Sequence, residues 1–280
     1  MAVLLALGSA AVYGASDFLG GLASRRATVF GVVALSQLAG LVALIALLPW
    51  LGGPVTRADL GWGAAAGLAG ATGLMVFFHA LSRGVMSVIA PVTAVTAAAV
   101  PVLAGLLGGN RIGPVTGVGI LLAVVAVVLV SAEGGLGRLR AARPASLGAP
   151  LVAGTAFGCF FVLLDRTSAD AGLTPLVAAR LASFGLVVVV ALIGRRSLRV
   201  GRSALPIAVA SGLGDMTANA LFLLATQQDG QLAITGVLAS LYPVSTVVLA
   251  QAVLRERLVG AQVAGLGTAV AAIVLITLPA

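Results

Sequence analysis

The stretch EGGLGRLRAARPAS, residues 133–146, lies at the middle of the 280-residue chain. It carries Arg138, Arg140 and Arg143 and is the longest run without an apolar block. On each side lies a similar length of nearly uncharged sequence, rich in Ala, Val, Leu and Gly, that divides into five segments of helix length. The stretch therefore predicts two similar halves, 1–132 and 147–280, joined by an arginine-rich linker.

The composition places the chain in a membrane. Hydrophobic residues make up 60% and charged residues 9% of the chain, and the mean hydropathy is +1.18, whereas soluble domains are about half apolar and a quarter charged. A bilayer core about 30 Å thick needs about 20 apolar residues per helix. The sequence lacks the alternation of polar and apolar residues that the strands of a transmembrane barrel require, so we do not expect a barrel. We predict an all-α integral membrane protein with ten transmembrane helices, at roughly 2–24, 28–50, 60–82, 85–108, 113–132, 147–165, 173–194, 204–226, 231–254 and 259–279.

The two halves resemble each other in sequence. A shift of 145 residues lays Gly67, Phe77 and Ala80 on Gly212, Phe222 and Ala225, and a shift of 144 lays Tyr13-Gly14 on Phe157-Gly158. Because each half has five spans, an odd number, the second half must enter the membrane upside down. The sequence thus predicts two inverted five-helix repeats, a design in which substrate sites form near the midplane between the repeats.

The distribution of arginine predicts an orientation. All sixteen cationic residues are arginine. Twelve of them fall on the linker side of the membrane, which the positive-inside rule makes cytoplasmic, so both termini would lie outside. The net charge of +8 is thereby explained by topology, and we expect no nucleic-acid partner. The twelve are Arg25, Arg26, Arg83, Arg138, Arg140, Arg143, Arg195, Arg196, Arg199, Arg202, Arg255 and Arg257.

Several features together resemble a known family. Ten spans arranged as five plus five, the stretch Tyr13-Gly-Ala-Ser-Asp-Phe18, and Leu241-Tyr-Pro-Val followed by Leu254-Arg-Glu-Arg-Leu258 are similar to the EamA-like family of the drug/metabolite transporter superfamily. The resemblance implies export or import of small metabolites, amino acids or toxic compounds through a central cavity. It also implies cytoplasmic termini, in conflict with the arginine count. The chain departs from the family pattern at Asn110, where the second half has Glu256, and at Asp17.

Charged residues within the spans are the first candidates for a site, because an ionisable group in a bilayer costs a few kcal/mol and is retained for a function by default. Helical rise places Arg180 about 21 Å and Asp215 about 16 Å from the arginine-rich face. A pair between them is therefore expected near the midplane. It has two readings: a static cross-link, or a cavity group in which Arg180 binds an anion and Asp215 exchanges a proton or binds a cation.

Other candidates are weaker. Asp17 and His79 lie about 10 Å and 5 Å from the same face, and each could serve as a proton or substrate site or as a structural residue. Among uncharged residues, Tyr13, Gln37, Asn219 and Tyr242 are candidates for hydrogen bonds to a solute. We expect a lining of small apolar residues with few aromatic rings. Prolines within the spans, which can bend a helix, are Pro91, Pro101 and Pro243.

Absent residue types exclude several chemistries. With no lysine, the phosphate-binding Gly-x-x-x-x-Gly-Lys loop cannot exist. One histidine and one cysteine do not make the usual zinc sets, and no Gly-x-Ser-x-Gly motif is present. We expect no metal, cofactor or catalytic residue, and transport would draw on a gradient.

These observations predict a secondary transporter of the inner cell membrane, whose partners are a small solute and the lipid bilayer. It would move a small organic metabolite, amino acid or drug, outward and with proton coupling or as a uniporter. The alternatives are a polytopic membrane enzyme, a lipid-handling scaffold, or a subunit of a larger membrane complex.

Overall fold

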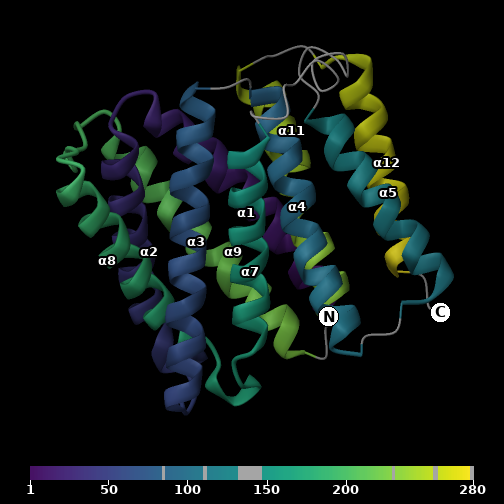
Figure 1. The fold of residues 1–280 in the computed structure, drawn as a ribbon, viewed down its shortest axis with the longest axis horizontal. Coiled ribbons are helices and arrows are strands. Elements are labelled where there is room, and N and C mark those ends of the chain that lie inside the picture. Colours follow the sequence, from purple (N-terminus) through teal and green to yellow (C-terminus); the bar gives the residue numbers. More distant parts are fainter. Residues whose placement is uncertain (84–85, 110–111, 132–146, 229–230, 255–257, 278–280) are drawn as a thin grey trace.

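The computed structural model describes residues 1–83, 86–109, 112–131, 147–228, 231–254 and 258–277, and within these ranges the named secondary-structure elements are all helices (Figure 1). The predicted all-α class is confirmed. The linker 133–146 lies outside the described residues. The helices are α1 (Ala2–Ser24), α2 (Val29–Leu51), α3 (Arg57–Arg83), α4 (Met86–Leu107), α5 (Pro114–Val130), α7 (Gly148–Asp165), α8 (Pro175–Ile193), α9 (Leu205–Gln227), α10 (Leu232–Ala239), α11 (Tyr242–Leu254) and α12 (Gly260–Thr277), with a short 3₁₀ turn, η2 (Ala169–Ala171), before α8.

The helices correspond to the ten predicted spans. Within the described ranges, eight helical segments are long and apolar enough to cross a membrane, and two shorter apolar helices, Val92–Leu107 and Pro114–Val130, fall on the fourth and fifth spans. The ninth span differs from the prediction, because it is divided into α10 and α11 at Ser240 and Leu241. Pro243 is the second residue of α11, where its missing N–H costs little, whereas within a continuous helix its ring would clash with a carbonyl of the preceding turn.

The packing of the helices follows the predicted inverted repeat. α1 packs against α9, and its counterpart α7 packs against α3. In the same way the contact of α2 with α9 is matched by that of α8 with α3, and the contact of α1 with α10 and α11 by that of α7 with α4. α5 and α12, which are counterparts, pack against each other at one edge of the bundle (Figure 1). Exchanging the two halves therefore leaves the principal helix contacts unchanged.

Glycines that align between the halves also occupy equivalent places. An added Cβ on Gly14 would collide with α11, and one on Gly158 would collide with Val100 of α4, the equivalent neighbour. Gly67 lies against the backbone of α8, and its counterpart Gly212 lies against the backbone of α2. Small residues let helices in a membrane approach closely, so the repeat predicted from these glycines corresponds to repeated packing.

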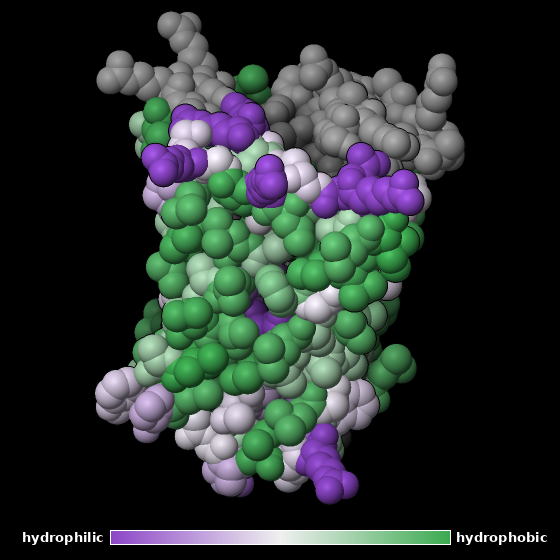
Figure 2. Space-filling model, turned by 90° about the vertical axis from the view of Figure 1, so that its left-hand side faces the viewer, coloured by the Kyte–Doolittle hydropathy of each residue, from purple (hydrophilic) through white to green (hydrophobic). Residues whose placement is uncertain are grey.

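Charge is concentrated at the two ends of the bundle. Figure 2 shows an apolar belt between strongly hydrophilic residues, which are most numerous at the end near the undescribed linker. Among arginines whose side chains are described, Arg57 and Arg166 belong to the opposite end, and six belong to the linker end and are exposed. These six are Arg25, Arg26, Arg195, Arg196, Arg199 and Arg202.

Two loops meet at the end opposite the linker. Gly52, after α2, forms an isolated antiparallel bridge with Gly172, before α8, and the Leu173 N–H donates to the Leu51 carbonyl at 2.9 Å. The Asp59 carboxylate, only 3% exposed, joins the same loops. It accepts hydrogen bonds from the N–H and hydroxyl of Thr56 at 2.9 and 2.6 Å, and from the N–H and hydroxyl of Ser168 at 2.7 and 3.0 Å. We call this set of bonds the Asp59 loop contact.

Candidate substrate site

A cavity of about 100 Å³ lies between the two repeats. About 10–15 Å³ of such space suffices for one water molecule, so the cavity can hold several waters or a small solute. It receives side chains from α1, α2, α3, α4, α7, α8, α9 and α11. Its lining residues are Tyr13, Asp17, Gln37, Gly70, Leu74, Ala97, Phe157, Phe160, Phe161, Leu176, Ala179, Arg180, Ser183, Asp215, Asn219 and Tyr242.

The predicted contact between Arg180 and Asp215 is confirmed. Arg180 Nη1 lies 2.6 Å from Asp215 Oδ2, and the two side chains are 5% and 34% exposed. The same nitrogen donates to Gln37 Oε1. Arg180 comes from α8, Asp215 from α9 and Gln37 from α2, so the guanidinium links three helices. A buried charge is costly unless it is paired and hydrogen-bonded, and this arrangement supplies both.

One nitrogen of this guanidinium is left over. Arg180 Nη2 is buried and has no hydrogen-bond partner among the described residues. An unsatisfied buried donor costs about 1–3 kcal/mol, and more when the group is charged. Because Arg180 lines the cavity, an acceptor atom of a bound solute or of water could satisfy this nitrogen.

Hydrogen bonds extend the ion pair toward α1. The Tyr13 hydroxyl donates to Asn219 Oδ1 at 2.7 Å, and Asn219 Nδ2 donates to the Asp215 carbonyl at 2.6 Å and to Asp215 Oδ2 at 3.2 Å. Asn219 stands one helical turn after Asp215 on α9, which brings its amide over the carboxylate. Five of the candidate residues therefore form one connected network, although the sequence analysis connected only Arg180 with Asp215. They are Tyr13, Gln37, Arg180, Asp215 and Asn219.

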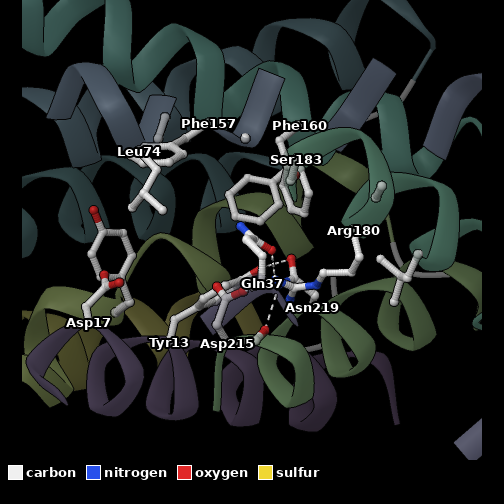
Figure 3. Close-up of a pocket in the computed structure, with 16 residues that line it drawn as sticks. Tyr13, Asp17, Gln37, Leu74, Phe157, Phe160, Arg180, Ser183, Asp215 and Asn219 are labelled. Atoms are coloured by element: carbon white, nitrogen blue, oxygen red, sulfur yellow. Dashed lines mark hydrogen bonds and ion pairs between the residues drawn. The ribbon is translucent and has the colours of Figure 1, made fainter. Parts of the chain in front are cut away.

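Asp17 stands apart from this network. It lines the cavity from α1 and is exposed, and it has no hydrogen bond or ion pair within the described part of the chain. In Figure 3 its carboxylate lies on the same side of the cavity as Tyr13 and Asp215, away from Arg180. Tyr242, the first residue of α11, also lines the cavity.

Of the remaining candidates, Pro101 and Pro243 do not line the cavity. The side chain of His79 and that of Pro91 lie outside the described residues, although their backbones belong to α3 and α4. Pro101 packs against α10, where an added Cβ on Gly236 would lie 2.5 Å from the Pro101 Cβ. α4 continues through Pro101 without a break.

The expectation of few aromatic rings was wrong. Phe157, Phe160 and Phe161 of α7 line the cavity beside Tyr13 and Tyr242. Tyr13 and Phe161 meet edge to face, with ring centroids 6.1 Å apart. The spacing of the three phenylalanines, i, i+3 and i+4, places them on one face of a helix. This pattern is visible in the sequence, but by itself it does not show whether the face meets the cavity, another helix or lipid.

The match to a known protein family divides the chain into the same two halves. The sequence profile of the EamA-like transporter family matches residues 1–132 and 145–278. The chain belongs to the EamA-like transporter family. It is therefore a multi-pass membrane protein of the drug/metabolite transporter superfamily, whose EamA-like members are transporters.

Other comparisons concern the fold only. No curated protein matches the chain. A solved structure described as "Crystal structure of protein" is similar, with a TM-score of 0.81 and 20% sequence identity over 99% of this chain and 98% of that one. At this identity the likeness shows that the two proteins share a fold, and it carries no information about the substrate.

Proposed function

We propose that this member of the family is a secondary transporter of the inner cell membrane, which exports a small organic metabolite, amino acid or drug by alternating access. The observation that carries the proposal is the Arg180–Asp215 pair in a cavity between two inverted repeats. Inverted repeats place substrate sites at their interface near the midplane, where rocking of one repeat against the other changes the side of access.

The chemistry of the pair favours a binding role over a static cross-link. A purely structural arginine would have its donors satisfied by the protein, but Arg180 Nη2 has no partner among the described residues. The planar guanidinium suits a carboxylate or another acceptor of the solute. Asp215, 34% exposed, and Asp17, which has no ion-pair partner in the described part of the chain, are the acids from which we propose proton coupling.

We propose the boundaries and orientation of the halves on sequence grounds. Residues 1–132 and 147–280 would be the two repeats, and 133–146 the linker between them. The exposed arginines at the linker end favour a cytoplasmic linker, and hence termini on the outer side. A protease site inserted in the linker and cleaved from one side of oriented vesicles tests this orientation.

The test of function is flux through purified protein in liposomes, screened over amino acids, organic acids and cationic drugs. Efflux from loaded vesicles, with and without a pH gradient, tests direction and proton coupling. We expect D215N and the double variant R180Q/D215N to insert and fold but to lose flux. D170N is the matched control, because Asp170 is an exposed acid outside the cavity.

Each outcome separates the proposal from its rivals. A folded double variant that transports at the wild-type rate would show that the pair is only a cross-link. Turnover of a solute without flux would indicate a membrane enzyme. If neither flux nor turnover is found over the whole screen, the transporter proposal fails and a subunit role is favoured.

A further inference from the structure

The cavity has two chemically different walls. Figure 3 shows Tyr13, Asp17 and Asp215 on one side and Leu74, Phe157 and Phe160 on the other. The first group comes from α1 and α9, which pack together, and the second from α3 and α7, which also pack together. The first wall is polar and the second is apolar.

The two walls consist of equivalent positions in the two repeats. With the shift of 144 that aligns α1 with α7, and the shift of 145 that aligns α3 with α9, four lining residues of the first repeat fall on four lining residues of the second. In each pair the α1 or α9 member is polar and the α3 or α7 member is apolar. The pairs are Tyr13 with Phe157, Asp17 with Phe161, Asp215 with Gly70, and Asn219 with Leu74.

Some hydrogen-bonding groups of the polar wall have no partner among the described residues of the protein. Arg180 Nη2, which joins this wall through Asp215, is a donor without a partner among the residues that the structure describes, and Asp17 is an exposed acceptor. The apolar wall offers only aromatic and aliphatic surface, apart from the Ser183 hydroxyl beside it, which donates to the Gly67 carbonyl at 2.7 Å. A polar group placed against that wall would lose its hydrogen bonds to water without replacement.

We propose, resting on the transporter function above, that the solute is amphipathic and binds in one orientation. Its polar head carries a hydrogen-bond acceptor and meets Arg180 at the α1/α9 wall. Its flat apolar body lies against Phe157 and Phe160 at the α3/α7 wall. Solutes lacking the apolar body bind weakly because they leave this wall without a partner.

The test compares matched solutes that differ by one phenyl group in liposome flux. The pairs are 3-phenylpropionate with propionate, phenylalanine with alanine, and phenethylamine with ethylamine, so the charge of the head varies while the phenyl difference stays constant. Burying a ring of phenylalanine size should favour the phenyl member by about tenfold or more. We expect this preference for 3-phenylpropionate or phenylalanine, whose carboxylates supply the acceptor. Phenethylamine, whose ammonium head has no acceptor, is the negative control, and a preference confined to that pair would overturn the inference.

Substitutions of Phe157 and Phe160 test whether the apolar wall causes the preference for the phenyl member of a pair. F157A and F160A should reduce it by at least about threefold, whereas F160L, which keeps an apolar side chain, should retain most of it. F184A is the matched control, because Phe184 packs in a different cluster on α8 and does not line the cavity.

The inference is overturned if both members of every pair are transported equally, or if F160A keeps the full preference; either result leaves the transporter proposal in place. Absence of flux for all six probes also overturns it, and the broader solute screen then decides the transporter proposal separately. If F157A or F160A fails to fold, the wild-type comparison and F160L still decide the matter.

Discussion

Neutralising Asp215 alone should destabilise the protein more than neutralising Arg180 alone, and more than neutralising both. Removing one partner of a buried ion pair costs about 3–5 kcal/mol, because the other charge stays buried and unpaired. D215N leaves the Arg180 side chain, 5% exposed, without its counter-charge, whereas R180Q leaves the Asp215 side chain, 34% exposed, beside the cavity. We therefore expect about 3 kcal/mol for D215N and about 2 kcal/mol for R180Q.

The double variant R180Q/D215N should lose less than the sum of the single variants. Neither neutral side chain leaves an unpaired charge, so the coupling energy should be about 3 kcal/mol, at the upper end of the range for directly contacting residues, and the double variant should lose about 2 kcal/mol. Thermal unfolding in detergent can be followed by reaction of the single cysteine, Cys159, half-buried in α7, with a thiol-reactive fluorophore. At roughly 2–4 °C per kcal/mol, D215N should unfold roughly 6–12 °C below the wild type.

Two results would refute this reasoning. If the effects of the single variants add in the double variant, the two side chains do not interact in the membrane protein. If R180Q is the more damaging change, the difference in burial between the two charges does not control the cost.

Three further changes test the packing, the loop contact and the hydrogen-bond network. G14A should clearly lower the unfolding temperature, because an added Cβ would collide with the backbone of α11. An added Cβ on Gly21 would have nothing within 4 Å, so G21A should leave the stability unchanged or increase it by up to about 1 kcal/mol, the helix preference of alanine over glycine. D59N should lower the unfolding temperature, because an amide cannot accept from every donor that the carboxylate satisfies, while D170N should leave it unchanged; both are read by thermal unfolding. Y13F removes the hydrogen bond to Asn219 and should cost about 0.5–1.5 kcal/mol in stability or solute affinity; an unchanged melting curve together with unchanged solute binding would show that this bond contributes nothing.

The fold was predictable because the bilayer leaves few choices. An uncharged stretch of about 20 residues has to be a helix in lipid, since only a helix satisfies its own backbone there, and ten such stretches are visible directly. Aligned glycines such as Gly67 and Gly212 revealed the repeat, because close helix contacts tolerate only small residues at those positions. The division of the ninth span was harder to see, since Pro243 indicates a disturbance but not whether the helix bends or stops.

The candidate site was predictable only in part. Arg180 and Asp215 could be paired because charge in lipid needs a partner and helical rise gives each residue a depth. The rotation of each helix about its axis does not follow from depth, so the part played by Phe157, Phe160 and Phe161 was missed. The same ambiguity hid the link from Tyr13 through Asn219 to Asp215, which depends on α1 packing against α9.

The Asp59 loop contact has a consequence for the transport cycle proposed above. Among the described residues, its counterpart in the other repeat is a hydrogen bond from the Thr28 hydroxyl to the Ser197 carbonyl at 2.7 Å, and the shift of 145 puts Ala204 where the first repeat has Asp59. The carboxylate is therefore a feature of one repeat and not of the other. If access alternates as proposed, opening the end that holds Asp59 has to break its four hydrogen bonds, and closing that end remakes them.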